Sequence, residues 1–379
     1  MRTHLTATVA LVTSLCAGLA ASQSLAASLA DRLERPARPS PLASQALLTD
    51  LQVVGAQVVV VGANGHVLLA DTDGRLQQAQ VPVDLLLTAV HFVDPSRGWA
   101  VGHDGVILHS QDGGLSWSKQ LDGNTINQLM TTWAEAEVSR LEAASAAAPD
   151  DEALSSALDN ALFALDDVKA GSEPGPSRPL LDIWFRDAQR GWAVGAYGIV
   201  LHTDDGGQTW KYLASLDNPD RLHLNTVLGL GDGSLLVAGE GGRLYRSEDD
   251  GTSWGPIQTQ TEASLYKLLD WQQGQRVLAL GFGGTLLSSA DSGRNWQSLS
   301  LPVKASLYGG SELTNGSLLL AGQGGVLLYS QDGQNFNTWQ GPSKSTWMNV
   351  AEVVPGQLAL VGRDGLHKLP LAEITERLQ

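Results

Sequence analysis

The side chains of this sequence that could carry out chemistry are mostly carboxylates held in glycine turns. Asp104, Glu240 and Asp364 each lie inside a Gly-x-x-Gly turn. Two carboxylates that face one cleft can cleave a glycosidic bond, one as the general acid and the other as the base or nucleophile. A glycoside hydrolase or a carbohydrate-binding protein is therefore one hypothesis, and its strength depends on where these turns lie in the fold.

A second set of aspartates lies in turns of the form Ser/Thr-x-Asp-x-Gly-x-x-Trp. Such a carboxylate can accept backbone N–H groups of its own turn, and the tryptophan is a large apolar side chain that can pack between neighbouring units. We therefore expect a structural role for this set, which comprises Asp112 with Trp117, Asp205 with Trp210, Asp249 with Trp254, Asp291 with Trp296, and a shortened Asp332 with Phe336.

The two kinds of turn recur together, and their period predicts the fold. The first glycine of the Gly-x-x-Gly turn occurs at Gly62, Gly102, Gly195, Gly239, Gly281, Gly322 and Gly362. Apart from one long step, the spacing is about 40 residues, which is typical of the four-stranded blade of a β-propeller. The sequence thus predicts an all-β fold, a seven-bladed β-propeller with four-stranded blades, over residues 42–370.

The long step contains an insertion of different composition at residues 122–178, between the second and third blades. It is rich in Ala, Glu, Asp and Leu and poor in glycine. Apolar residues recur there at helical spacing, so we expect an α-helical hairpin. Thr125-x-x-Gln128 is a candidate capping box for its first helix. The expected apolar faces are Ile126, Met130, Trp133/Ala134, Val138 and Leu141 in the first helix, and Leu154, Leu158, Ala161/Leu162, Leu165 and Val168 in the second.

The N-terminus indicates export. Residues 1–27 have the basic start, apolar run and small-residue cleavage site of a signal peptide. Cys16 is the only cysteine and lies within that segment, so the mature chain has no disulfide or thiolate chemistry. We expect a periplasmic monomer without a membrane span after cleavage. The net charge of −16 argues against a nucleic-acid partner.

The combined pattern Gly-Trp-Ala-Val-Gly-x-x-Gly, followed by the Asp-box, resembles the photosystem II stability/assembly factor family of BNR propellers. The motif stands at Gly98–Gly105 and at Gly191–Gly198. The resemblance implies a non-enzymatic factor, without cofactor or metal, that binds a protein partner and aids a membrane complex. Exported relatives in bacteria that do not photosynthesise make an exporter one candidate client. The strong acidity and the helical insertion depart from the photosynthetic members.

Two positional predictions follow from the topology. The last unit has no room for a fourth strand before the polar tail of residues 371–379, so we expect residues around Arg38–Leu42, at the end of the extension of residues 28–41, to close the ring as the outer strand of the last blade. The Gly-x-x-Gly turns and the insertion should share one face. We expect this face to bind the partner through Asn64, His103, Asp104, Tyr197, Glu240, Phe282, Gln323 and Arg363.

Overall fold

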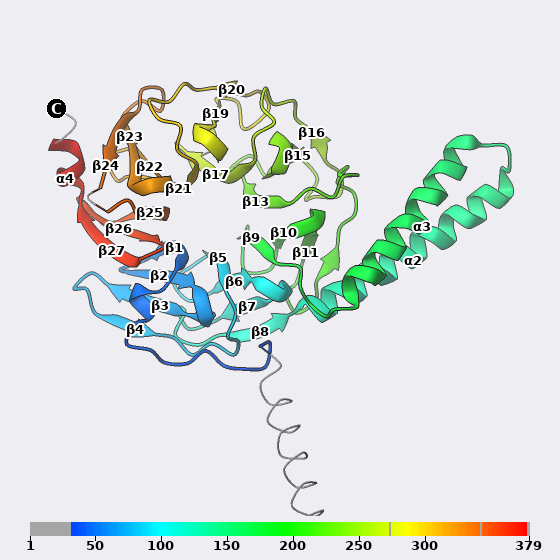
Figure 1. The fold of residues 1–379 in the computed structure, drawn as a ribbon, viewed down its shortest axis with the longest axis horizontal. Helices are drawn as coiled ribbons and strands as arrows, with labels where there is room; N and C mark the ends of the chain where they lie inside the picture. Colours follow the sequence, from blue (N-terminus) through cyan, green and yellow to red (C-terminus); the bar gives the residue numbers. More distant parts are fainter. Residues whose placement is uncertain (1–31, 273, 342, 377–379) are drawn as a thin grey trace, which may run out of the picture.

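The computed structural model describes residues 32–376, except residues 273 and 342, so the predicted signal peptide lies outside the described residues. In this part of the chain the strands form seven antiparallel sheets, six with four strands and one with three. The sheets surround a common centre, and the first strand of each sheet lies innermost (Figure 1). The prediction of an all-β propeller built from four-stranded antiparallel sheets is thereby confirmed for most of the ring.

The sheets are numbered from first to seventh in chain order. The first three comprise β1 (Leu48–Val54), β2 (Gln57–Gly62), β3 (Val67–Asp71) and β4 (Leu76–Gln78); β5 (Leu87–Phe92), β6 (Gly98–Gly102), β7 (Ile107–Ser110) and β8 (Ser118–Leu121); and β9 (Leu180–Phe185), β10 (Gly191–Gly195), β11 (Val200–Thr203) and β12 (Lys211–Tyr212). The fourth and fifth comprise β13 (Leu224–Gly229), β14 (Leu235–Gly239), β15 (Leu244–Ser247) and β16 (Gly255–Pro256); and β17 (Leu265–Trp271), β18 (Arg276–Gly281), β19 (Leu286–Ser289) and β20 (Gln297–Ser298). The last two comprise β21 (Leu307–Glu312), β22 (Leu318–Gly322), β23 (Val326–Ser330) and β24 (Asn337–Gln340); and β25 (Trp347–Val354), β26 (Gln357–Gly362) and β27 (Gly365–Pro370).

The core lies between the sheets. The second strand of each sheet is a nearly unbroken apolar run because both of its faces are covered by neighbouring sheets. In β14, for example, every residue is buried. Each apolar cluster combines residues of two adjacent sheets, and one cluster joins Val361 of the seventh sheet to Leu48 of the first. Apolar burial between sheets therefore helps to hold the ring together, and side-chain hydrogen bonds between adjacent sheets, such as Thr88 Oγ1 to Leu180 O, add to it.

The Gly-Trp motifs place their tryptophans at these interfaces. Trp99 is fully buried and stacks on Phe185 of the next sheet, with ring centroids 3.6 Å apart. The preceding Gly98 has to be glycine, because a Cβ there would lie 2.5 Å from the ring of Phe92. Trp117 of the second sheet's Asp-box meets the same Phe92 edge to face and packs in the cluster shared with the first sheet.

The predicted ring-closing strand is wrong. The seventh sheet has three strands, and Arg38–Leu42 is not part of it. Instead, the N-terminal segment runs along the outside of β4 and β8 (Figure 1), where Ala37 N donates to Val81 O and the Arg38 carbonyl accepts from Gln78. The segment goes there because Leu33 fits into the apolar cluster between the first and second sheets.

The chain after the last strand is not only a polar tail. Leu371–Thr375 forms the short helix α4, and Ile374 is fully buried. Ile374 packs in the cluster between the sixth and seventh sheets, beside Trp347. The helix therefore covers apolar surface next to the three-stranded sheet.

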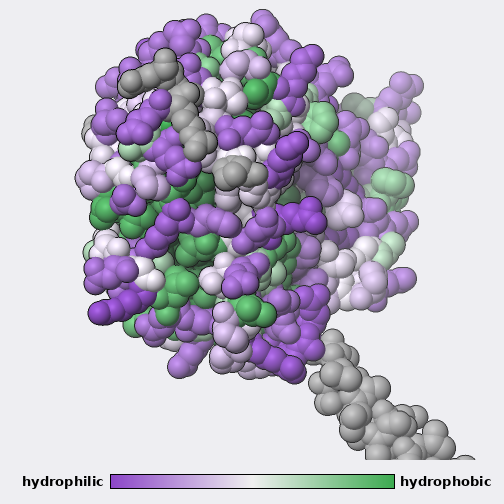
Figure 2. Space-filling model, turned by 60° about the vertical axis from the view of Figure 1, so that its left-hand side comes forward, coloured by the Kyte–Doolittle hydropathy of each residue, from purple (hydrophilic) through white to green (hydrophobic). Residues whose placement is uncertain are grey.

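The insertion forms two helices, α2 (Gly123–Ala147) and α3 (Glu152–Ser172), which project outward from the ring (Figure 1). The cap of α2 is Asp122, which accepts from Asn124 N and Thr125 N, so the expected capping box at Thr125 is not the cap. The predicted apolar face of α2 is buried except for Trp133, whereas Val168 is the only buried residue of α3. The face of the molecule shown in Figure 2 is mainly hydrophilic and carries small apolar patches.

Candidate functional site

Six of the Gly-x-x-Gly turns fold as short 3₁₀ turns between the second and third strands of their sheets: η2 (Ala63–Gly65), η3 (His103–Gly105), η4 (Ala196–Gly198), η5 (Glu240–Gly242), η6 (Phe282–Gly284) and η7 (Gln323–Gly325). Arg363 lies in the corresponding turn between β26 and β27. These turns emerge at the ends of strands opposite to the Asp-box turns. We call the surface they form the η-turn face.

The predicted face residues occupy two different positions of the turn. Asn64, Asp104 and Tyr197 are second residues with φ near +58°, +54° and +58°. His103, Glu240, Phe282 and Gln323 are first residues, and in η5 to η7 the second position is glycine. Asparagine and aspartate tolerate this left-handed conformation, but a tyrosine there is unusual. Tyr197 is thus held in a strained position, with its side chain 53% exposed.

A cavity of about 450 Å³ lies at the centre of the ring, beside the η-turn face. Residues near the start of the innermost strands line it, among them Asp50, Asp182, Tyr266, Lys267 and Tyr308. The innermost strands share an irregularity at the same point, directly after the residue that pairs with the glycine preceding the η turn. In six of them it is a shift on the innermost strand, such as that between Leu48 and Asp50 in β1. In the third sheet, where β9 pairs with β10, the register shifts between Val194 and Gly195. A bulge re-aims side chains, so these positions point into the cavity.

Buried charges fix one wall of the cavity. Lys267 Nζ lies 3.2 Å from both carboxylate oxygens of Asp182, which also accept from Thr226 Oγ1 and Val227 N. Burial alone would lower the pKa of Lys267, but the carboxylates of Asp182 and Asp50 outweigh it and raise that pKa. Burial raises the pKa of Asp50 above its usual range. Sequence reasoning missed these residues, although each follows the first leucine of its strand by two positions.

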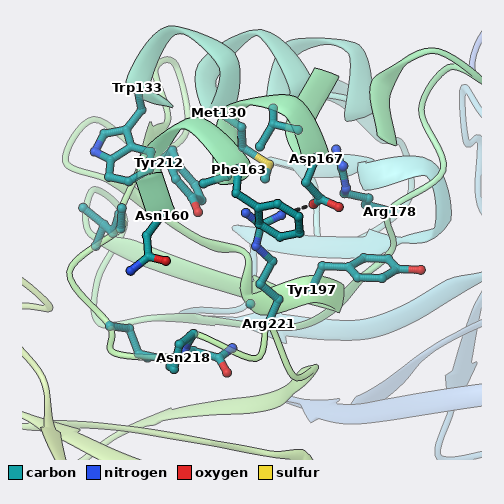
Figure 3. A pocket seen from close by; sticks show the side chains of 17 residues that line it. Met130, Trp133, Asn160, Phe163, Asp167, Arg178, Tyr197, Tyr212, Asn218 and Arg221 are labelled. Atoms are coloured by element: carbon teal, nitrogen blue, oxygen red, sulfur yellow. Dashed lines mark hydrogen bonds and ion pairs between the residues drawn. The ribbon is translucent and has the colours of Figure 1, made fainter. Parts of the chain in front are cut away.

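A second hollow, of about 330 Å³, lies between the base of the hairpin and the third sheet (Figure 3). We call it the hairpin groove. Its wall contains Met130 and Trp133 of α2, Phe163 and Val168 of α3, Tyr197 of η4, and Tyr212 of β12. Trp133 and Tyr212 meet edge to face at 5.7 Å between ring centroids. Tyr197 is the one predicted face residue that lines either of these two hollows.

Two arginines line the hairpin groove, and their surroundings differ. Arg221 forms an ion pair with Asp167 of α3, which ties the hairpin to the ring. Arg178 is buried, and its Nη1 donates a hydrogen bond to the amide oxygen of Asn127. Burial lowers the pKa of Arg178, and among the described residues its guanidinium forms no ion pair with a carboxylate. The groove therefore combines large aromatic side chains with a guanidinium that has no anionic partner.

The Asp-boxes show the expected turn geometry. Asp112 accepts from Ser110 Oγ at 2.9 Å and from Ser116 N at 2.9 Å, and Gly114 N donates to Ser110 Oγ. The same bonds recur around Asp205, Asp249 and Asp291, and around Asp332 one residue shorter. Hydrogen bonds, first of all from the Thr209 hydroxyl, lower the pKa of Asp205 to about 2. These carboxylates stabilise their own turns.

The geometry gives the glycosidase hypothesis no support. Asp104, Glu240 and Asp364 do not line the central cavity, and Glu240 accepts from His223 N. The carboxylates that do line it, Asp50 and Asp182, are occupied by internal hydrogen bonds. The repeating arginines are paired within their own turns, Arg97 with Asp94 and Arg190 with Asp187.

Residues 32–376, without 273 and 342, hold no group of three or more His, Cys, Asp or Glu residues that could bind a metal ion. None of the helices in this part of the chain is both long and apolar enough to cross a membrane.

With this geometry established, the chain was compared with known proteins. The sequence profile described as photosynthesis system II assembly factor YCF48 matches residues 176–263. The photosystem II assembly protein Ycf48 of Synechococcus sp. (strain JA-3-3Ab) is 28% identical over 183 residues, which are 48% of this chain and 52% of that protein. The family resemblance is confirmed. The chain spans about half, or less, of the length of the curated relatives it matches first.

Solved structures agree on the fold. A structure titled "YCF48 bound to D1 peptide" has a TM-score of 0.58 at 20% identity and covers 85% of this chain and 92% of its own. The WD40 β-propeller domain of Doa1 reaches a TM-score of 0.59 at 10% identity, over 89% of this chain and 95% of that one. At these identities the likeness shows the propeller fold. The chain therefore has a propeller fold, which carries the hairpin groove and the central cavity described above.

Proposed function

We propose that this chain is an exported, non-catalytic accessory factor: a seven-bladed propeller, with the helical hairpin between its second and third blades, that binds a polypeptide segment of a membrane-complex subunit through its η-turn face. The relatives named above are assembly proteins, and one YCF48 structure is titled as bound to a peptide. Export to the periplasm is supported by the composition of residues 1–27.

The observation that carries this proposal is the set of exposed aromatic side chains on the η-turn face. Tyr197 and Phe282 are 53% and 60% exposed on turns whose backbone is fixed by the flanking strands. Phe163, at the rim of the hairpin groove, is 73% exposed. Large aromatic side chains on rigid elements are typical anchors of protein interfaces, because little conformational entropy is lost when they are buried.

Site-specific photo-crosslinking tests the proposal. A benzophenone amino acid replaces Phe282 or Phe163 in the exported protein, and cross-links are collected from intact cells and assigned by mass spectrometry. The matched control position is Leu115, which is 42% exposed but lies on an Asp-box turn at the opposite end of the strands. We expect a membrane-complex subunit to be cross-linked from Phe282 and Phe163 and not from Leu115. Cross-links from Leu115 alone would place the binding surface on the other face.

The export part of the proposal is tested separately. Residues 1–31 are fused to an alkaline phosphatase that lacks its own signal and is active only after export. Activity in cells would support export, and a fusion that stays inactive while the protein accumulates would contradict it.

A further inference from the structure

We propose that the hairpin groove binds an acidic side chain of the partner polypeptide, an Asp or Glu next to a large apolar residue, and that Arg178 holds the carboxylate. This inference rests on the proposed function and specifies its ligand.

Burial of the Arg178 guanidinium is unfavourable for the free energy of folding. Its side chain is more than nine-tenths buried and lines the groove. A buried guanidinium is strongly unfavourable unless it is paired or fully hydrogen-bonded. Its hydrogen-bond partner is the neutral amide of Asn127, and among the described residues it forms no ion pair with a carboxylate. The charge is thus available for an anion from outside the chain.

Arg178 lies beside the end of α3. Gly171, in the last turn of that helix, faces the guanidinium, and a Cβ there would require Arg178 Nη2 to move from its present position. The C-terminal end of a helix also favours a nearby cation, which offsets part of the burial cost. It does not supply the planar, bidentate acceptor that a guanidinium matches best, which is a carboxylate.

The other side chains of the hairpin groove determine which residues can flank the bound carboxylate. The neighbouring Arg221 is neutralised by Asp167, so Arg178 is the unneutralised cation of the groove. Aromatic side chains are spread along the groove. In the view of Figure 3, Trp133 and Tyr212 lie at its left, Phe163 lies near its middle, and Tyr197 lies at its right. A peptide that passes through the groove would place apolar side chains on these rings and a carboxylate at Arg178. On a protein with a net charge of −16, such a local site selects an acidic residue by geometry rather than by long-range attraction.

The test uses the mature protein, without residues 1–27, as bait for a phage-displayed random dodecapeptide library. The best binder is then synthesised with both ends blocked, together with its Glu→Gln or Asp→Asn counterpart, and both are titrated by fluorescence polarisation. We expect selected sequences to place an acidic residue beside an aromatic or aliphatic one. We expect the acidic peptide to bind about 10-fold or more tightly than its amide counterpart.

Variants assign the effect to the groove. Arg178→Gln removes the positive charge but keeps a polar side chain, so it should remove most of the preference for the acidic peptide and leave the affinity for the amide counterpart nearly unchanged. Tyr197→Gly should weaken both peptides, and it keeps the turn because glycine occupies that position in η5 to η7. Ser292→Gly is the matched control, because Ser292 also has a positive φ but lies in an Asp-box turn. It should change neither affinity.

The outcomes separate the two proposals. Selected peptides without acidic residues, or an acidic preference that survives Arg178→Gln in a folded protein, would overturn the inference and leave the proposed function standing. If Arg178→Gln does not fold, a Tyr197→Gly protein that binds both peptides as tightly as wild type overturns the inference instead. Failure of the cross-linking experiment at Phe282 and Phe163 would overturn the proposed function itself.

Discussion

Asn349 Nδ2 donates a hydrogen bond of 2.7 Å to Asp50 Oδ1 and so joins the seventh sheet to the first. The two residues lie at the same register position of β25 and β1, two residues after the first residue of each strand. Within residues 32–376, as far as they are described, no strand from one end of the chain joins the sheet at the other end, so the ring closes through this bond and the apolar cluster around Val361 and Leu48.

Asn349→Ala should therefore destabilise the protein. It leaves the buried Asp50 carboxylate one donor short, which costs about 1–3 kcal/mol. Thermal unfolding followed by circular dichroism measures the loss. Asn315→Ala is the control, because its side chain caps only a local turn with Ser317 and should have a smaller effect. Equal melting temperatures for wild type and Asn349→Ala would show that the apolar cluster alone closes the ring.

Leu33→Ala should also lower stability, by about 2–5 kcal/mol, because it leaves a cavity between the first and second sheets. The matched control is Leu42→Ala, whose side chain is 61% exposed and should matter little. Chemical denaturation of both variants measures the difference. The opposite order would mean that Leu42, and not Leu33, anchors the N-terminal segment.

Tyr197 should tolerate glycine better than valine. Glycine adopts a φ of +58° without strain, whereas a β-branched residue is strongly disfavoured there. We expect Tyr197→Gly to melt at or above the wild-type temperature and Tyr197→Val to melt clearly below it. If both variants melt well below wild type, the packing of Tyr197 in the hairpin groove outweighs its backbone strain.

The Asp-boxes should lose their stabilising effect in acid. The pKa of Asp205 is about 2 in the folded protein and lies below that of an unfolded aspartate, about 3.9. Its stabilising contribution is therefore complete above about pH 5 and is lost as the pH falls through about 2. Asp205→Asn should be less stable than wild type at pH 7, and the difference in melting temperature should shrink towards pH 2. A constant difference across that range would contradict this origin.

The sequence predicts the parts of the fold that repeat. Strands, turns and Asp-boxes follow from local patterns at a fixed period, and the apolar face of α2 follows from helical spacing. The path of the N-terminal segment does not, because Leu33 meets its partners in the first and second sheets through tertiary packing that no local pattern records. The Asp122 cap was overlooked because Thr125 offered a better-known motif three residues later.

The candidate site could be predicted only where it coincides with a repeat. Tyr197 was found because it stands in a recurrent turn. Arg178 and Phe163 were not, because their meeting depends on how the hairpin folds back on the third sheet. The residues of the central cavity did have a sequence signal: Asp50, Asp182 and Lys267 are charged residues two positions after the first leucine of strands that are mostly apolar.

The ends of the hairpin insertion meet at its base. A Cβ on Gly123 would lie 2.6 Å from Cβ of Pro176, so the chain leaves the ring and returns to it at almost the same point. An insertion with joined ends can be lengthened, exchanged or replaced without moving any strand. Partner choice and ring stability can therefore change independently in evolution, and the same junction offers a place to graft a different recognition element onto this propeller.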